Sequence, residues 1–263
     1  MKSILVLEGN SPELVAASRA RTGMSSAEMY GRALESLDPT IKMTTAAPYE
    51  RSLTEDELQN IDGIVLTGSG VQWSTDAPEA ESQRQAVSMV FDKGIPTFGS
   101  CNGMQLAAVI LGGQVGASPH GKEVGLALDI NKTEIGKQHP LLMGRMDGYA
   151  VPCVHRDEVQ KLPEKAEHLA ENAHSPIQAF AYKAEGVDFW GVQYHPEYTT
   201  ACVAELMRTP GTLWQNSAQA DLLEIADTDL DAAKKLGVHG DDLTPAVRMT
   251  ELKNWLNHLE KIE

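Results

Sequence analysis

A cysteine flanked by small residues is the most reactive group that the sequence offers. Phe98 and Gly99 end a short apolar run, Ser100-Cys101-Asn102-Gly103 follows, and a helical pattern begins at once. This arrangement is typical of a nucleophile on a tight turn between a strand and a helix, because small neighbours permit a strained backbone. The turn places the sulfur at a helix N-terminus, where unsatisfied N–H groups and the helix dipole favour thiolate. The alternative is that Cys101 is a small buried apolar residue, as most cysteines are.

A histidine and a glutamate two residues apart supply the acid–base groups that a thiol nucleophile needs. His195 follows the apolar run 189–194, and Pro196 and Glu197 come next. A histidine can take the proton of a thiol and return it to a leaving amine, provided that an acceptor fixes its other ring nitrogen. Pro196 restricts the residue before it and holds the turn. We therefore expect Cys101, His195 and Glu197 to act together.

Short apolar runs that alternate with helical patterns must position these groups. The alternation predicts an α/β fold with an open, mostly parallel sheet and helices on both faces. Ser25 and Glu28 have the spacing of a capping box at a helix start, and Gly112-Gly113 is a helix stop. Strands are expected at 3–7, 62–66, 94–99, 124–130, 148–154, 177–183 and 189–194, and helices at 26–37, 79–92 and 102–111.

Beyond Tyr198 the pattern is almost entirely helical. Long helices are expected over 218–236 and 244–262, and the second has one apolar stripe formed by Val247, Leu252, Trp255, Leu256, Leu259 and Ile262. We therefore predict a domain at 1–205 and a helical C-terminal extension at 206–263 that packs on it. The extension would serve as a lid near the site or as a brace on the sheet, and a homodimer contact is the alternative.

The composition excludes several classes of protein. The formal net charge of −15 repels phosphate backbones, so no nucleic-acid partner is expected. No run approaches the ~18 apolar residues of a membrane span, and the first apolar run is too short for a signal peptide. Three cysteines at wide spacing do not make a disulfide framework and favour a reducing cytoplasm. Cys153 and Cys202 lack the context of a nucleophile, so we interpret both as structural. The absence of metal signatures and phosphate-binding glycine loops predicts neither a metal nor another cofactor.

Several motifs occur in the order that one enzyme family shows. The stretch 99–105 is followed about 90 residues later by 191–197, Gly-Val-Gln-Tyr-His-Pro-Glu. This pair of motifs resembles the class I, or triad, glutamine amidotransferase family, and within it the glutaminase domain of GMP synthase. The stretch 66–70 stands where that family has its oxyanion loop, 153–159 resembles its Ser-His-x-Asp-x-Val segment, and 175–180 resembles the segment before its final strands. The resemblance covers about residues 1–205 and implies a flavodoxin-like core.

The resemblance implies a role for each reactive residue. Cys101 would attack the side-chain amide carbon of glutamine and form a γ-glutamyl thioester. His195 would protonate the departing ammonia and then activate water, while Glu197 would orient His195. The oxyanion would be held by the backbone N–H of Asn102 and by one N–H from the loop after residue 67, for which alignment favours Ser69.

The same resemblance implies a set of residues around the bound substrate: Gly68, Gly70, Gln105, His155, Arg156 and Asp157. Residues 155–157 would meet the α-amino and α-carboxylate ends of the substrate, largely through backbone, although a purely structural His155 is the alternative. The family's loop reads Gly-Gly-Pro where this chain has Gly68-Ser69-Gly70. A positive φ at the second position would therefore strain Ser69, and Gly70 is the alternative oxyanion donor. Trp73 either walls the pocket or has an ordinary packing role.

Three functions follow from these residues. The first, which we favour, is a hydrolase that works alone on glutamine or another small γ-glutamyl amide. The second is a glutaminase subunit that delivers ammonia to a separate synthase, since the sequence contains no synthase domain. The third is a catalytically silent binding module of the same fold, and the presence of Cys101, His195 and Glu197 argues against it.

Overall fold

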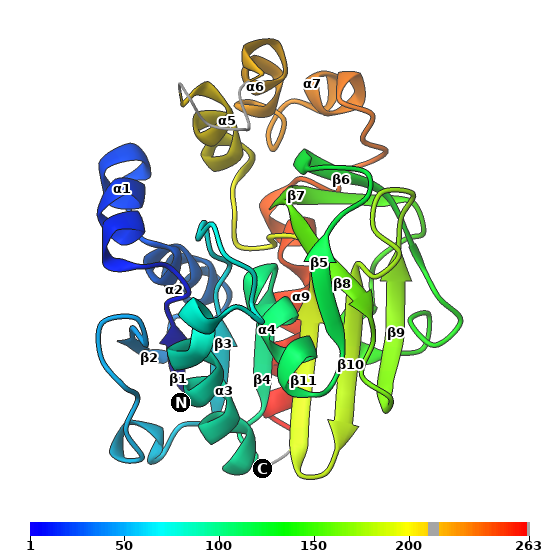
Figure 1. Ribbon diagram of the computed structural model, residues 1–263. Coiled ribbons are helices and arrows are strands. Elements are labelled where there is room, and N and C mark those ends of the chain that lie inside the picture. The colour runs from blue at the N-terminus through cyan, green and yellow to red at the C-terminus, as the bar shows by residue number, and fades with distance from the viewer. Residues whose placement is uncertain (210–215, 262–263) are drawn as a thin grey trace.

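A nine-stranded sheet forms the centre of the computed structural model, which describes residues 1–209 and 216–261 (Figure 1). Its strands lie in the order β2-β1-β3-β4-β11-β10-β9-β6-β7. They are β1 (Ser3–Leu7), β2 (Lys42–Ala46), β3 (Gly63–Leu66), β4 (Thr97–Ser100), β6 (Glu123–Lys132), β7 (Tyr149–His155), β9 (Ala166–Glu171), β10 (Ala179–Ala184) and β11 (Val187–Val192). A separate two-stranded sheet pairs β5 (Gln114–Ala117) with β8 (Asp157–Lys161).

The sheet is mostly parallel, as the alternating pattern predicts. The strands β2, β1, β3, β4 and β11 are joined by parallel pairings. The pairings from β11 through β10, β9 and β6 to β7 are antiparallel, so only β10 and β6 run against the other strands. The apolar runs of β1 and β3 are buried almost throughout, which is typical of the parallel part of an α/β sheet. The strands β2, β5, β8 and β9 were not predicted, because much of each is polar or exposed.

Helices cover both faces of the sheet. In β1, Ile4 and Val6 belong to an apolar core shared with α2 and α9, whereas Leu5 and Leu7 belong to a core shared with α3 and α4. A third core joins α5, α6 and α7 to β6 and β7. The helices are α1 (Pro12–Thr22), α2 (Ser26–Leu37), α3 (Glu81–Asp92), α4 (Asn102–Ile110), α5 (Thr200–Arg208), α6 (Ser217–Leu223), α7 (Leu230–Lys235), α8 (Pro245–Arg248) and α9 (Thr250–Leu259), with short 3₁₀ turns at Asp56–Leu58, Pro78–Ala80 and Pro140–Leu142.

The structure contains the two helix-boundary signals that were predicted from the sequence, at the start of α2 and at the end of α4. The Ser25 side chain accepts from the Glu28 N–H, and the Glu28 carboxylate accepts from the Ser25 N–H at 2.6 Å, which completes the capping box of α2. Gly112 follows α4 with φ +91°, a conformation that glycine adopts without strain. These local signals therefore fix the start of α2 and the end of α4.

The C-terminal helices differ from the prediction. The expected helix at 218–236 is wrong, because the Asp229 side chain accepts from the N–H groups of Asp231 and Ala232 and starts a new helix there. The expected helix at 244–262 is divided at Met249, which has non-helical backbone angles, and Ile262 lies outside the described residues.

The predicted boundary at residue 205 falls inside α5, and part of the predicted extension, 210–215, is also outside the described residues. The division into two domains stays a prediction.

The last helix lies across the central strands, close to the sheet. Trp255 packs on Phe98 of β4 with ring centroids 6.0 Å apart. Gly63 of β3 leaves room for this helix, since a Cβ at that position would meet Leu259 at 2.8 Å and Trp255 at 2.9 Å. The apolar stripe of α9 is therefore covered by the sheet (Figure 1).

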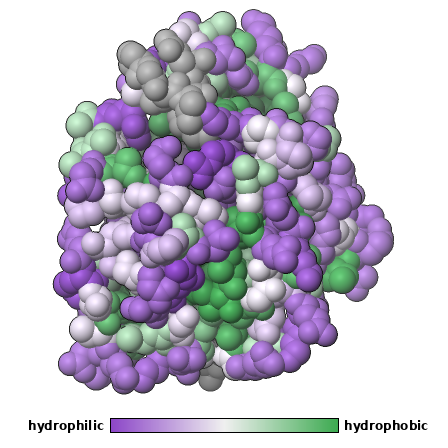
Figure 2. All heavy atoms as spheres, in the orientation of Figure 1, coloured by the Kyte–Doolittle hydropathy of each residue, from purple (hydrophilic) through white to green (hydrophobic). Residues whose placement is uncertain are grey.

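The molecular surface is polar over most of the face shown in Figure 2, with an apolar patch near α3 and α4. Partly buried apolar side chains such as Met89, Ile110 and Leu111 pack against the core in this region. Within residues 1–209 and 216–261, no helix is both long enough and apolar enough to cross a membrane.

Candidate active site

Cys101 occupies a strained turn between β4 and α4. Its backbone has φ 47° and ψ −111°, and its N–H donates to Val192 O at 2.8 Å. Two glycines make the turn feasible: a Cβ at Gly99 would lie 2.9 Å from the backbone of Gly103, and a Cβ at Gly103 would lie 2.5 Å from Leu66 O. A positive φ at a non-glycine residue costs free energy and is retained where the surrounding structure enforces it. The turn holds the thiol at the N-terminus of α4.

The sheet brings His195 and Glu197 to the same edge as Cys101. The strands β4 and β11 are parallel and in register, with Ser100 opposite Val192, so the segments that follow them leave the sheet side by side. His195 Nδ1 lies 2.7 Å from Glu197 Oε1, and both side chains are almost fully buried. Tyr198 stacks on the imidazole with ring centroids 4.1 Å apart. The three residues of the predicted triad thus meet in one place.

The electrostatic surroundings of His195 favour its protonated form. Burial lowers the pKa of His195, but the charge of Glu197 and the interaction with Cys101 outweigh burial and raise it to about 10. The imidazole therefore carries a proton at neutral pH. A cysteine next to an imidazolium, itself held by a carboxylate, has the components of nucleophilic acyl transfer.

The loop after β3 faces this group. A Cβ on Gly68 would come within 2.5 Å of His195 Cε1, so only glycine fits there. The N–H of Gly70 donates to Asn10 Oδ1 at 2.8 Å, whereas the N–H of Ser69 has no acceptor among the described residues. Ser69 does not have a positive φ, so the strain considered for this position does not arise.

The side chains predicted to contact substrate on the other side of Cys101 are largely engaged with the protein. Gln105 Nε2 donates to Asp157 O at 2.6 Å and to a neighbouring glutamine, and the side chain is buried. His155 contacts Asp157 O at 3.1 Å through Nδ1. Arg156 binds the Asp157 carboxylate through two bonds of 2.8 Å and donates to Gln72 O at 3.0 Å. These bonds tie the 155–157 segment to the loop after β3 and to α4.

A cluster of buried polar side chains contacts the 155–157 segment through His155. Glu123, Cys153 and His155 offer three metal-ligand atoms within 4.8 Å of one another among the described residues. Glu123 Oε2 lies 2.9 Å from His155 Nε2 and 3.6 Å from Cys153 Sγ, and its carboxylate also accepts from Asn172 and Gln178. Burial, with the charge of Glu123, raises the pKa of the Cys153 thiol well above its usual range. Because the ligand atoms of Cys153 and His155 both have Glu123 as a hydrogen-bond partner, we interpret the cluster as a hydrogen-bonded support for β7.

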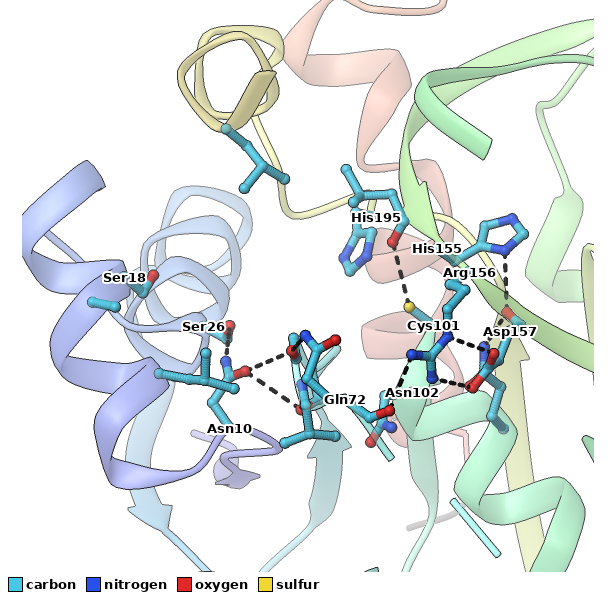
Figure 3. A pocket seen from close by; sticks show the side chains of 18 of the residues that line it. Asn10, Ser18, Ser26, Gln72, Cys101, Asn102, His155, Arg156, Asp157 and His195 are labelled. Atoms are coloured by element: carbon cyan, nitrogen blue, oxygen red, sulfur yellow. Dashed lines mark hydrogen bonds and ion pairs between the residues drawn. The ribbon is translucent and has the colours of Figure 1, made fainter. Parts of the chain in front are cut away.

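Cys101, Asn102, His195 and residues 154–157 line a pocket of about 430 Å³ (Figure 3). Trp73 lines it and also donates from Nε1 to Tyr49 Oη at 2.9 Å, so this residue both packs and walls the pocket. Sequence reasoning missed the wall formed by α1, whereas Leu206 of α5, which also lines the pocket, belongs to the predicted helical extension. The helix α1 has little apolar periodicity and buries only Ser18, so it lacks the apolar stripe that marked the predicted helices, although Pro12 and Gly23 bound it. The lining residues from these two helices are Leu14, Ala17, Ser18, Arg21 and Leu206.

The C-terminal helices hold the backbone that carries His195 and Glu197. Arg248 is buried, and its Nη1 donates to Pro196 O at 3.2 Å and also to Tyr198 O. These two carbonyls lie on either side of Glu197. The contact of Arg248 with these carbonyls could not be predicted from a local sequence pattern, because Arg248 belongs to a short helix far along the chain.

Comparisons with known proteins agree on one family. Residues 22–203 match the family model described as glutamine amidotransferase class-I. A gamma-glutamyl-L-1-hydroxyisopropylamide hydrolase of a Pseudomonas species is 30% identical over 97% of this chain and 92% of its own length. A glutamine-hydrolyzing GMP synthase of Wolinella succinogenes is 33% identical over 57% of this chain, but the match spans only 27% of the synthase. A glutamine amidotransferase structure from Thermotoga maritima, 20% identical, covers 98% of this chain and 97% of its own with a TM-score of 0.66. A structure from Methylobacillus flagellatus, 18% identical, gives the same TM-score over 97% of this chain and 95% of its own.

Proposed function

The chain belongs to the class I glutamine amidotransferase family, and from this premise we propose that it hydrolyses the side-chain amide of N-substituted γ-glutamyl amides or of glutamine. The observation that carries the proposal is the meeting of Cys101, on its strained turn, with the His195–Glu197 pair. The similarity to a γ-glutamyl amide hydrolase over almost the whole chain supports a hydrolase that works alone.

In the proposed reaction Cys101 is the nucleophile. Its thiolate attacks the γ-carbonyl carbon, and the oxyanion that forms accepts hydrogen bonds from the N–H groups of Asn102 and Ser69. One such donor contributes about 3 kcal/mol when it is aimed at the developing charge. Asn102 begins α4, so its N–H has no partner within the helix, and the Ser69 N–H is likewise without an acceptor among the described residues.

The leaving group and the water are handled by His195. The imidazolium donates its proton to the amide nitrogen, the C–N bond breaks, and a γ-glutamyl thioester remains on Cys101. His195, now neutral, takes a proton from water, whose oxygen attacks the thioester and releases glutamate and the thiolate. Glu197 holds Nδ1 throughout and stabilises the imidazolium.

A second function, ammonia delivery to a separate synthase, is favoured by one observation, the similarity of half or more of the chain to GMP synthases. A glutaminase of that kind would prefer glutamine and release ammonia. The hydrolase that works alone would prefer amides that carry a substituent on the nitrogen.

One experiment tests the proposal. Purified protein is incubated with glutamine and with a series of N-alkyl γ-glutamyl amides, and released glutamate is measured. We expect turnover of the N-alkyl amides, and we expect Cys101→Ser to abolish it, because an alcohol is far harder to ionise than a thiol. Glutamate release by the Cys101→Ser variant at the wild-type rate would refute the role of Cys101. No release by the wild type from any compound would instead favour a silent binding module or a glutaminase subunit whose activity waits for a synthase.

A further inference from the structure

The pocket extends to both sides of the Cys101 thiol. On one side lie Gln105 and the segment 155–157, which the hydrogen bonds described above hold in place. On the other side lie α1 and the side chain of Leu206 from α5. Figure 3 shows His195 on the side of Cys101 that faces these two helices.

The position of His195 assigns the two ends of the pocket to the two parts of a substrate. In the proposed reaction His195 protonates the amide nitrogen, so the amine part must lie beside the imidazole. The γ-glutamyl part then extends from the carbonyl carbon in the opposite direction, toward residues 155–157. Tyr198, which stacks on His195 at 4.1 Å, continues the wall toward α5.

Two arginines line the pocket, and among the described residues only Arg156 has a charged partner. Arg156 is bound by the Asp157 carboxylate through two hydrogen bonds. Arg21 forms no ion pair or hydrogen bond with any described residue, and its Nε atom is buried without a partner. Buried polar groups of native proteins are almost always satisfied, so an unsatisfied donor in the wall of a pocket is available to a ligand. A guanidinium matches a carboxylate through two parallel hydrogen bonds.

We propose that the end of the pocket between α1 and α5 binds the amine part of the substrate, and that Arg21 binds a carboxylate on that amine. The inference rests on the proposed function. Leu14, Ala17 and Leu206 supply apolar contacts for a short aliphatic spacer between the nitrogen and the carboxylate. The substrate class is then a γ-glutamyl amide of a small amino acid. Hydrolysis breaks its C–N bond, adds the oxygen of water to the γ-carbonyl carbon, and releases glutamate and the free amino acid.

Two substrates of the same shape test the role of Arg21. The compounds γ-glutamyl-β-alanine and γ-glutamyl-β-alaninamide differ only in a carboxylate and a neutral amide. We expect the wild type to favour the carboxylate about 10- to 100-fold in kcat/KM, chiefly through KM, as charge-assisted hydrogen bonds allow. Arg21→Met should remove the preference, and Arg21→Lys should restore part of it. Arg19→Met on the same helix is the matched control, because Arg19 pairs with Glu28 and its side chain is 55% exposed, and it should keep the preference.

The outcomes separate this inference from the proposed function. Equal kcat/KM for the two compounds in the wild type, or a preference that survives in Arg21→Met, would overturn the inference while leaving γ-glutamyl amide hydrolysis intact. Absence of glutamate release from these compounds, from N-alkyl amides and from glutamine would overturn the proposed function itself, and the inference with it.

Discussion

The buried ion pair between Arg145 and Glu251 should contribute strongly to the free energy of unfolding. Both side chains are fully buried, and the guanidinium binds the carboxylate through bonds of 2.8 Å from Nε and 2.9 Å from Nη2. Glu251 also accepts a bond of 3.0 Å from Tyr194 Oη, next to His195. The ion pair therefore joins α9 to the loop before β7, and the Tyr194 bond joins α9 to the segment that follows β11.

We expect Glu251→Gln to lower the free energy of unfolding by about 3 kcal/mol. Removing one partner of a buried ion pair costs about 3–5 kcal/mol, because the remaining charge is left uncompensated. Asp242 Oδ1 lies 4.0 Å from Arg145 Nη1 and offsets part of the loss, which favours the lower figure. At about 2–4 °C per kcal/mol for a chain of this size, the melting temperature should fall by about 6–12 °C.

Thermal unfolding followed by circular dichroism, together with urea titration, measures this change. The matched control is Glu260→Gln: Glu260 pairs with Lys2 at 2.8 Å, but its side chain is 62% exposed, so the loss should stay below about 1 kcal/mol. Replacing both partners, Arg145→Met with Glu251→Leu, should recover much of the stability, because no unpaired charge remains. If Glu251→Gln melts within about 1 °C of the wild type, the ion pair does not stabilise the fold and the reasoning is refuted.

Two further predictions concern turnover. Glu197→Gln should slow hydrolysis by about 10³- to 10⁴-fold, and it should also move the alkaline limit of activity. The carboxylate raises the pKa of His195 to about 10, so the wild type should hold its proton for the leaving amine until the pH rises through about 10. The variant should lose activity at lower pH, and an unchanged profile of kcat/KM against pH would mean that another acid orients His195. Arg248→Met should lower kcat by about 10- to 100-fold with little change in KM, because its guanidinium holds the carbonyls on either side of Glu197. A loss confined to KM, or activity at the wild-type level, would contradict this positioning role.

The parallel core and the meeting of the reactive residues could be predicted from the sequence. Apolar runs and helix stops are local signals, and Cys101 stands between a strand and a helix that both have them. His195 follows another apolar strand, and parallel pairing of the two strands brings the following segments together. Residue type and spacing were therefore sufficient to predict the parallel core and the proximity of the reactive residues.

Features that depend on contacts distant in the chain could not be predicted. Arg145 and Glu251 are ordinary charged residues in the sequence, and only the folded chain buries them against each other. The wall formed by α1 was missed because its exposed helix has no apolar stripe. Gln105, which the resemblance assigns to the substrate, lines the pocket, and only the folded chain shows that its amide also donates to Asp157 O. Such partners are set by tertiary packing rather than by any local pattern.

The packing of α9 also sets the order in which the protein can complete its fold during synthesis. Trp255 covers Phe98, and 157 residues (255 − 98) separate them. At about 5–20 residues per second, the ribosome needs roughly 8–30 s to make this stretch. The part of β3 and β4 that α9 covers in the folded protein stays exposed for that interval, and exposed strands of this kind are prone to aggregate. We therefore expect the nascent chain to need protection from aggregation until α9 has been made.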